Sequence, residues 1–252
     1  MKNITIYPCW VAGGKMIYDI EHLYRQHLQN NLEFPRLISY PRCGSHWFRY
    51  IMEYTLEMPC IVSSYKFANP NIEDCWGLHI HDRRLDNSDC PPTKNLKKVI
   101  YLWRNPVDVI YSQLRYDGKL PDIFSPSHIR SLDLDVKYLI REYANHLQRY
   151  RFKNEDIAEF LEITYEQMKE NTEAIMIKSM GFLNLKFDKE KLRKVISECT
   201  KLKISQGIHD KPAIDMIAAI RPEQHKKNKD VFKSIYGKFI TRELKDLTEP
   251  KR

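Results

Sequence analysis

Short apolar runs alternate with longer amphipathic stretches along much of the chain. Residues 37–40 form a short apolar run that Pro41 ends, which predicts a buried strand. Residues 97–103 are rich in β-branched and aromatic side chains after a charged entry, which is typical of a second strand. Residues 159–165 predict another strand, and a short one is expected near 77–80. These runs are the candidate strands of a sheet.

Apolar residues at helical spacing lie between these runs. They predict helices over residues 18–30, about 47–58, about 106–116, 133–151, 168–180 and 188–200. Long loops are expected over residues 60–95, and the last fifty residues are predicted to be mostly loop with a short terminal helix. Strands that alternate with helices favour an α/β fold with a central parallel β-sheet flanked by helices.

Length and charge narrow the class of protein. The 252 residues fit a single domain spanning 1–252, and 41 Lys and Arg against 33 Asp and Glu give a net charge of +8. A mildly basic chain suits a nucleotide that carries several phosphates. Apart from residues 226–229 the basic residues are spread out, so we expect no nucleic-acid partner.

Cysteine usage and hydropathy suggest where the protein works. The six cysteines form no Cys-x-x-Cys pair and have no metal-ligand spacing, which is typical of reduced thiols in the cytoplasm. No signal pattern opens the sequence, and no apolar run approaches the roughly 20 residues that span a bilayer. We therefore expect a cytoplasmic protein with no membrane partner, either a monomer or a homodimer.

The turn after the first predicted strand carries the first chemical signal. A strand that turns directly into a helix leaves unpaired N–H groups and the positive end of the helix dipole at the turn, which together bind anions. Arg42 adds a forked cation there, and Ser45 adds a hydroxyl group. The turn is not a Walker loop, because no Gly-Lys-Ser/Thr follows, and this disfavours a nucleotide kinase.

The turn after residues 97–103 carries the second signal. Asn105 is a predicted helix cap and Pro106 fits the first helical position, so Arg104 lies where the strand ends. Ligands of parallel sheets bind at the carboxyl ends of the strands, which places Arg104 near the first turn. Ser112 follows about two helical turns later, and the two side chains can hold one phosphate. The alternative is that Arg104 forms a salt bridge and that Ser112 only packs. We expect Asp108 to interact with the helix N-terminus.

Three segments resemble the PAPS-dependent sulfotransferases of the cytosolic type, where PAPS is 3′-phosphoadenosine 5′-phosphosulfate. Residues 40–47 (Tyr-Pro-Arg-Cys-Gly-Ser-His-Trp) resemble the loop that grips the 5′-phosphosulfate, and residues 99–112 resemble the segment for the 3′-phosphate. Residues 160–171 resemble a third family segment, and together the matches lie within 36–181. The resemblance implies a three-layer α/β/α fold like that of P-loop nucleotide-binding proteins. It also implies transfer of a sulfuryl group from PAPS to a hydroxyl or amine of a small-molecule acceptor, with 3′,5′-ADP as product.

The resemblance also implies which residues contact PAPS. They are Arg42, Cys43, Gly44, Ser45, His46, Trp47, Arg104, Ser112 and Tyr165. The family usually has Lys at the position of Arg42, Ser at that of Cys43 and Thr at that of His46. A helix N-terminus can lower the pKa of a thiol such as Cys43, although a small packing residue is the simpler role. The family's C-terminal Arg-Lys-Gly has no clean counterpart, and the candidates for its role are Arg221, Lys226 and Lys227.

A histidine serves the family as general base about twenty residues before the arginine for the 3′-phosphate. Two candidates lie there, His79 and His81, and residues two apart in a strand share a face. His81 aligns better with the family position, whereas His79 has a structural alternative. The ordinary pKa of histidine, near 6.5, allows either to accept a proton at neutral pH. A His-x-His pair can ligate a metal, but no third ligand is evident, so we expect none.

The acceptor is the part that the sequence defines least. Loops over about 60–95, 115–130 and 203–240 are expected to form its pocket, and a specialised metabolite is one candidate. Two other functions are compatible with the motifs. Cys43 and Arg49 form a Cys-x5-Arg pair like that of cysteine phosphatases, although bulky aromatic residues fill this loop. A nucleotide-binding module without catalysis is the other.

Overall fold

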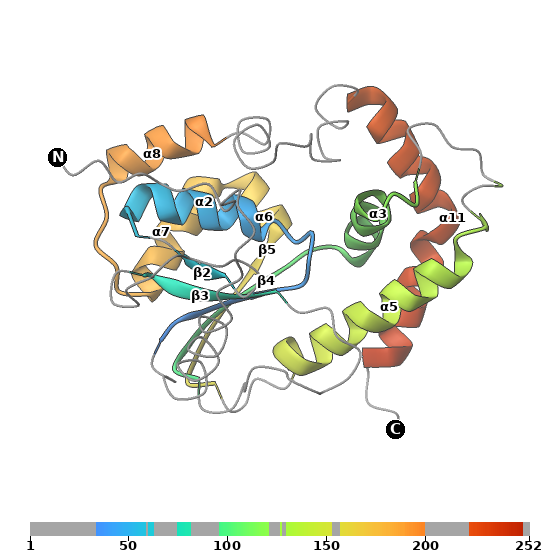
Figure 1. Ribbon diagram of the computed structural model, residues 1–252, viewed down its shortest axis with the longest axis horizontal. Coiled ribbons are helices and arrows are strands. Elements are labelled where there is room, and N and C mark those ends of the chain that lie inside the picture. The colour runs from blue at the N-terminus through green and yellow to red at the C-terminus, as the bar shows by residue number, and fades with distance from the viewer. Residues whose placement is uncertain are drawn as a thin grey trace, which may run out of the picture.

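A computed structural model describes residues 34–58, 60–62, 75–81, 96–120, 127, 130–152, 157–199 and 222–248 (Figure 1). Its centre is a five-stranded parallel sheet with the order β2-β3-β1-β4-β5. The strands are β1 (Arg36–Ser39), β2 (Cys60–Val62), β3 (Gly77–His81), β4 (Lys98–Trp103) and β5 (Glu159–Thr164). The predicted α/β fold with a parallel sheet is confirmed. The sequence did not predict β2, which is only three residues long and lies in the stretch assigned to loops.

Helices connect and flank these strands. They are α2 (Ser45–Leu56), α3 (Pro106–Tyr116), α5 (Asp133–Leu147) with its π-helical continuation η2 (Gln148–Phe152), α6 (Tyr165–Glu170), α7 (Thr172–Phe182), α8 (Lys189–Glu198) and α11 (Pro222–Thr248). The helix predicted over 168–180 is two helices, because Asn171 ends α6 and its side chain accepts a hydrogen bond from Ala174 N to begin α7. The helix predicted over 18–30 lies outside the described residues.

The prediction of a mostly irregular C-terminal region is wrong for residues 222–248. These residues form the single helix α11, 27 residues long. Pro222 is compatible with the first position of a helix, where its missing N–H is not needed. The helix buries Phe232, Tyr236 and Ile240, spaced four residues apart, against α3 and α5. Tertiary packing therefore stabilises a helix despite Gly237, which has a low helix propensity.

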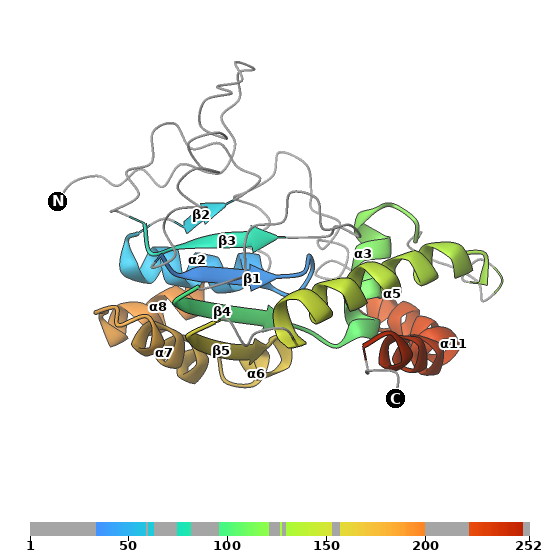
Figure 2. The same ribbon diagram turned by 90° about the horizontal axis from the view of Figure 1, so that it is seen from below.

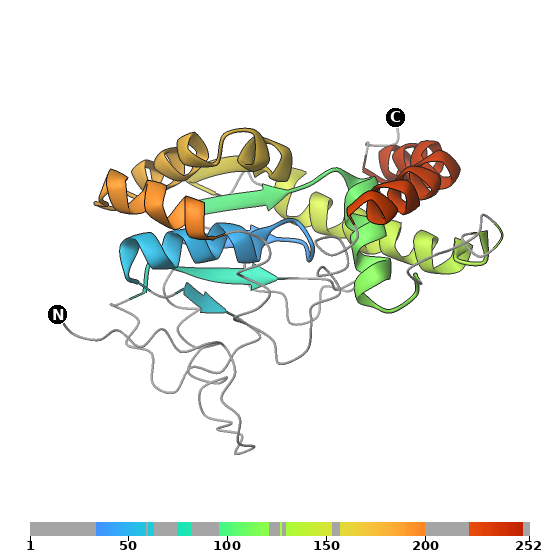
Figure 3. The same cartoon turned by 90° about the horizontal axis from the view of Figure 1, so that it is seen from above.

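The main core lies on both faces of the sheet. Helices α2, α7 and α8 pack on one face, as Figures 1 and 3 show. The C-terminal part of α5 and η2 cover the other face, where Tyr143, His146 and Tyr150 meet Tyr40 of the β1 end and Tyr101 of β4. The predicted three-layer α/β/α arrangement is thus present.

A second apolar cluster joins α3, α5 and α11. The helices share a set of buried side chains that includes Val107, Leu114, Leu139, Phe232 and Ile240. Figure 2 shows this group beyond the arrowheads of the strands, at the carboxyl edge of the sheet. A ligand bound at the carboxyl edge of the sheet would therefore lie beside side chains of α3, α5 or α11. None of the described helices is both long enough and apolar enough to cross a membrane.

Candidate functional site

The central strands end level with one another at the carboxyl edge. Ser39 of β1 is paired in register with His81 of β3 and with Leu102 of β4. The turns that follow β1 and β4 consequently start side by side. Segments that are far apart in the sequence meet at this edge (Figure 2).

The turn after β1 leaves the N-terminus of α2 open. Arg42 and Gly44 have φ angles of 69° and 93°, both in the left-handed region, and Gly44 is the N-cap of α2. No side chain caps this helix, and its first turn contains no acidic residue. The other α-helices in the described part of the chain all have an aspartate or glutamate in the first turn. The positive end of α2 is therefore suited to an anion.

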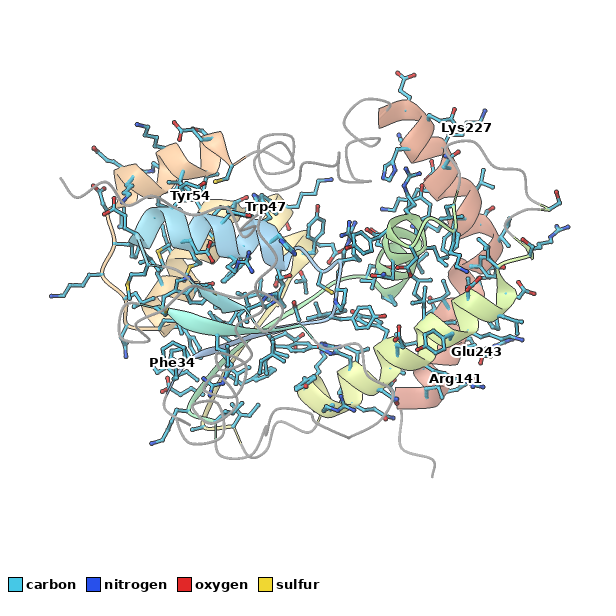
Figure 4. The ribbon with its side chains drawn as sticks, viewed as in Figure 1. Phe34, Trp47, Tyr54, Arg141, Lys227 and Glu243 are labelled. Carbon is cyan, nitrogen blue, oxygen red and sulfur yellow. The ribbon has the colours of Figure 1, made fainter. Side chains whose placement is uncertain are left out.

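Tyr165 lies against this turn. A Cβ atom placed on Gly44 would be 2.6 Å from Cδ2 of Tyr165, so the ring occupies the space that a side chain would need. Trp47, which Figure 4 shows at the N-terminal end of α2, meets the same ring edge-on at 6.1 Å between centroids. The guanidinium of Arg104 lies 4.2 Å from the ring centroid. The structure thus brings together four residues that the sequence assigned to one site.

The two arginines and Ser112 also meet. Nε of Arg42 donates to Oγ of Ser112 at 3.2 Å, and its guanidinium lies 4.9 Å from the ring centroid of Tyr116. Nη1 of Arg104 donates to the carbonyl oxygen of Arg42 at 3.1 Å. Arg42 and Arg104 are therefore neighbours although they come from different strand–turn–helix units.

The charge of Arg104 is partly balanced by Asp108. Nη2 of Arg104 lies 3.6 Å from Oδ2 of Asp108, and Nζ of Lys229 from α11 lies 2.7 Å from the same oxygen. Arg104 therefore does form the salt bridge that the sequence left open as an alternative, and it also lies beside the turn after β1. The cluster holds two cations and one carboxylate, which leaves a net positive charge beside the turn.

The sequence did not single out Lys229 of α11, which the structure brings to Asp108 beside the candidate site. Lys226 and Lys227 are exposed, and Figure 4 shows Lys227 on the end of α11 that lies away from the sheet. Arg221 is outside the described residues. The available signal is helical spacing, because Lys229 precedes Phe232 by one turn and shares the buried face of α11. That signal depends on knowing that the segment is a helix.

The two histidines differ in their surroundings. His79 is buried, and its Nε2 lies 3.0 Å from Oγ of Ser39 on the neighbouring strand. His81 is the last residue of β3, and its side chain is not among the described ones. The structure therefore gives His79 a hydrogen-bonded position inside the sheet, and it places the backbone of His81 at the carboxyl edge.

The Cys43 thiol is inside the protein. Burial raises the pKa of Cys43 to about 12, against the smaller opposite effects of Arg104 and of a hydrogen bond with Tyr143. The alternative of a lowered thiol pKa is therefore wrong for Cys43, because burial raises the pKa more than Arg104 and Tyr143 lower it. The small packing role agrees with the structure.

Arg49, the partner of Cys43 in the phosphatase-like pair, lies in the body of α2. Its Nε is 3.0 Å from Oε1 of Glu53, which also accepts a hydrogen bond from Cys60 N at 3.1 Å. Burial raises the pKa of Glu53 to about 7, while Arg49 opposes that rise. A neutral thiol and an arginine engaged elsewhere do not form the nucleophile loop of a phosphatase. In the part of the chain that the structure describes, no group of three or more His, Cys, Asp or Glu could hold a metal ion.

Comparison with known proteins gives the site a context. The family model described as "Sulfotransferase domain" matches residues 36–233. Sulfotransferase 6B1 of Mus musculus is 26% identical over 190 residues, which cover 66% of this chain and 60% of the relative. Sulfotransferase 2B1 of Homo sapiens is 32% identical over 107 residues, 41% of this chain and 29% of the relative. The chain spans less than two thirds of the length of either curated relative.

A solved structure shares the fold. It is the crystal structure of mouse sulfotransferase SULT7A1 complexed with PAP, with a TM-score of 0.50 and 18% sequence identity. The match covers 88% of this chain and 92% of that one. At this identity the likeness concerns the fold, and the role of each residue must come from the site itself.

Proposed function

Because the chain belongs to the sulfotransferase domain family, we propose that it transfers a sulfuryl group from PAPS to a small-molecule acceptor. One contact supports this most directly, the hydrogen bond from Arg104 Nη1 to the carbonyl oxygen of Arg42. It holds a cation at the end of β4 beside an open helix N-terminus at the end of β1. Two adjacent anion sites at one sheet edge suit a nucleotide with phosphates at both ends of its ribose.

The residues divide between the two ends of the donor. Arg42 and the backbone N–H groups at the start of α2, from Ser45 and His46 onward, would hold the 5′-phosphosulfate. Arg104 and Ser112 would hold the 3′-phosphate. Their separation by one arginine–carbonyl contact suits two groups carried by the same ribose.

Tyr165 and Trp47 would lie beside the adenosine, because their rings meet edge-on next to the turn. Gly44 allows that approach, since any side chain there would meet Tyr165. Cys43 packs in the main core and would not contact the donor. The C-terminal cation beside the 3′-phosphate would be Lys229, in place of Arg221, Lys226 or Lys227.

The chemistry would be a single in-line displacement. The acceptor oxygen or nitrogen attacks the sulfur of PAPS and forms a new bond to it. The bond between sulfur and the 5′-phosphate oxygen breaks, and its electron pair stays on that oxygen, giving 3′,5′-ADP. The acceptor proton passes to the imidazole of His81. Arg42 stabilises the negative charge that develops on the leaving phosphate.

Ser112 would orient Arg42 for this task. Its hydroxyl accepts a hydrogen bond from Nε of the guanidinium at 3.2 Å, which helps to fix the orientation of that group. The ring of Tyr116 lies close to the same guanidinium. An arginine fixed in this way can bind two phosphate oxygens without a large loss of side-chain entropy.

His81 is the better candidate for the base. The His79 side chain is 1% exposed and is hydrogen-bonded to Ser39, so an acceptor would not reach it without opening the sheet. We propose that His79 supports β3 and that His81 faces the acceptor. His81→Ala is then expected to lower kcat by about 100-fold or more with little change in binding of 3′,5′-ADP, in line with the usual size of general-base effects. A non-catalytic nucleotide-binding module would instead be unaffected by this change.

The acceptor would be a small molecule with a hydroxyl or amine group. Its pocket would be built by about 60–95, 115–130 and 203–240, of which the structure describes only parts. Tyr116 is 57% exposed beside Arg42, which makes it the described aromatic residue best placed to contact an acceptor.

Titration calorimetry with 3′,5′-ADP, 5′-AMP and ADP tests the donor site. We expect 3′,5′-ADP to bind about 100-fold more tightly than 5′-AMP, because charge-assisted hydrogen bonds contribute about 1.5–3 kcal/mol and tenfold is about 1.4 kcal/mol. Arg104→Ala should remove most of this preference, whereas Lys227→Ala, at an exposed position, should retain it. Equal binding of the three nucleotides to the unmodified protein would contradict the proposal. Transfer from PAPS to a panel of phenols, alcohols and amines would then identify the acceptor class.

A further inference from the structure

Helix α5 contacts the ends of both strands that carry the donor site. Glu142 and Tyr143 are consecutive residues on it, and both side chains are buried. Oε2 of Glu142 accepts a hydrogen bond from the Tyr40 hydroxyl at 3.0 Å, directly before the turn after β1. Tyr143 reaches Arg104, directly after β4. Figure 2 shows one end of α5 beside the arrowhead of β4, with the rest of the helix running away from the sheet.

Tyr143 contacts the ends of both strands. Its hydroxyl donates to the carbonyl oxygen of Arg104 at 2.7 Å and accepts from the backbone N–H of the same residue at 3.4 Å. Its ring meets the ring of Tyr40, directly after β1, edge-on at 5.0 Å between centroids. One side chain thus touches both segments that lead into the turns that would hold the two phosphates.

A second buried tyrosine nearby shows that packing does not require these contacts. Tyr101 and Tyr143 both have 0% exposure and belong to the same core cluster. Among the described residues, the Tyr101 hydroxyl has no hydrogen-bond partner. The ring alone is therefore enough to fill the core. The hydroxyl of Tyr143 differs in that it is bonded to the backbone of Arg104.

We propose that Tyr143 is a positioning residue that fixes the spacing between the two phosphate subsites. It would thereby set the preference for a nucleotide phosphorylated at both the 3′ and the 5′ position. This inference rests on the proposed function, because it concerns how the same donor site discriminates among nucleotides.

The physical reason is preorganisation. The two phosphates of the donor are held by one ribose at a nearly fixed separation, whereas the two subsites belong to separate strand–turn–helix units. The second phosphate adds its full contribution to binding only if both subsites are already at the matching distance. The contact from Arg104 to Arg42 uses a side chain that must also bind the phosphate, so it cannot fix that distance alone. The hydroxyl of Tyr143 is instead bonded to the backbone of Arg104.

The test is the ratio of the dissociation constants of 5′-AMP and 3′,5′-ADP in Tyr143→Phe and in Tyr101→Phe. Both variants lose one buried hydroxyl from the same cluster. We expect the ratio to fall about tenfold in Tyr143→Phe and to stay within about twofold of the unmodified protein in Tyr101→Phe. Binding is measured by calorimetry well below the unfolding temperature, with circular dichroism to show that each variant is folded.

Each outcome decides between the roles. A lower unfolding temperature for Tyr143→Phe with an unchanged ratio would mean that the hydroxyl is only structural, and would overturn the inference. If Tyr143→Phe does not fold, Tyr40→Phe removes the hydrogen bond by which α5 holds the end of β1 and should lower the ratio in the same direction; an unchanged ratio would again overturn the inference. If the unmodified protein has no 3′-phosphate preference, the proposed function itself fails and the inference with it. A failure of the inference alone leaves that preference intact.

Discussion

The two strand–turn–helix units at the carboxyl edge differ in how the N-terminus of the helix is capped. The unit of β1 and α2 has an uncapped helix with Gly44 at the N-cap and no acidic residue in the first turn. In the unit of β4 and α3, Asn105 accepts a hydrogen bond from Val107 N, Pro106 occupies the first position, and Asp108 lies in the first turn. The second helix N-terminus is already satisfied by its own side chains.

The difference shows which part of each unit can bind an anion. At α2 the backbone itself is available, so an anion can be held by the N–H groups of the helix as well as by the side chain of Arg42. At α3 the backbone is occupied, so an anion must be held by side chains, namely Arg104 and Ser112. The first subsite depends on conformation and the second on residue identity.

The helices are also anchored differently. In α2 the buried pair Arg49–Glu53 reaches the backbone of Cys60 at the sheet edge. In α3 the half-buried pair Asp108–Lys229 reaches α11. Titration of a carboxyl group in a buried pair changes the free energy of unfolding with pH. A partly exposed pair contributes little net stability.

Gly44→Ala is expected to have the largest effect, because it blocks the subsite that depends on conformation. A non-glycine residue in the left-handed region costs about 1–2 kcal/mol, and the new Cβ would displace the ring of Tyr165. Binding of 3′,5′-ADP measured by calorimetry should weaken by about 100-fold or more. Gly118→Ala is the matched control, because its φ is 71° but nothing lies within 4 Å of the added Cβ. Unchanged binding in Gly44→Ala would show that the turn adapts.

Glu53→Gln should change how stability depends on pH. The pKa of Glu53 is raised from its ordinary 4.5 to about 7, so its contribution is fully present below pH 4.5 and is lost as pH rises through 7. At 1.36 kcal/mol per pKa unit, the unmodified protein should lose about 3 kcal/mol relative to Glu53→Gln between pH 4.5 and pH 7. Urea unfolding of both proteins across this range measures the difference. Glu170→Gln, at an exposed position, should follow the unmodified protein, and parallel curves for Glu53→Gln would refute the shift.

Asn105→Ala tests the claim that α3 binds no anion through its own terminus. Loss of the cap should cost about 1 kcal/mol and lower the unfolding temperature by roughly 2–4 °C. Binding of 3′,5′-ADP should change by less than about threefold. Asn171→Ala removes the equivalent cap of α7 and should lower stability equally. A tenfold loss of affinity in Asn105→Ala, not seen in Asn171→Ala, would mean that the α3 terminus holds the phosphate after all.

Alkylation of Cys43 should show the smallest effect. With a pKa of about 12, the thiolate fraction at pH 8 is on the order of one in ten thousand. Iodoacetamide should leave the Cys43 peptide unmodified in the folded protein and label it in urea, as read by mass spectrometry. Cys199, which is only half-buried, provides the internal reference. Labelling of Cys43 at the rate of Cys199 would contradict the raised pKa and would support a phosphatase with a Cys43 thiolate as nucleophile.

The sequence predicted the features that depend on residues close together in the chain. Strands β1, β4 and β5 and the two turns follow from apolar runs and from turn residues a few positions apart. The nearness of Arg42 and Arg104 followed from the rule that ligands bind at the carboxyl ends of parallel strands. Gly44 and Tyr165 were added to the site only by the resemblance to the sulfotransferases.

Tertiary packing decided the rest. Helix α11 forms because its apolar face is buried against α3 and α5, and only then does Lys229 come near Asp108. The thiol of Cys43 is kept neutral by burial that no sequence motif reveals. In the sequence Tyr143 looks like any core tyrosine, and only the structure shows its hydroxyl bonded to the backbone of Arg104.

The strand order has a consequence for how the chain folds as it is made. Strand β1 lies in the middle of the sheet, yet its neighbours β3 and β4 both follow it in the sequence. During synthesis from the N-terminus, β1 therefore waits as an unpaired apolar strand until the residues of β3 have left the ribosome. The later β4 completes the pairing on its other side. Protection of this strand by a chaperone in that interval would favour the native sheet over aggregation.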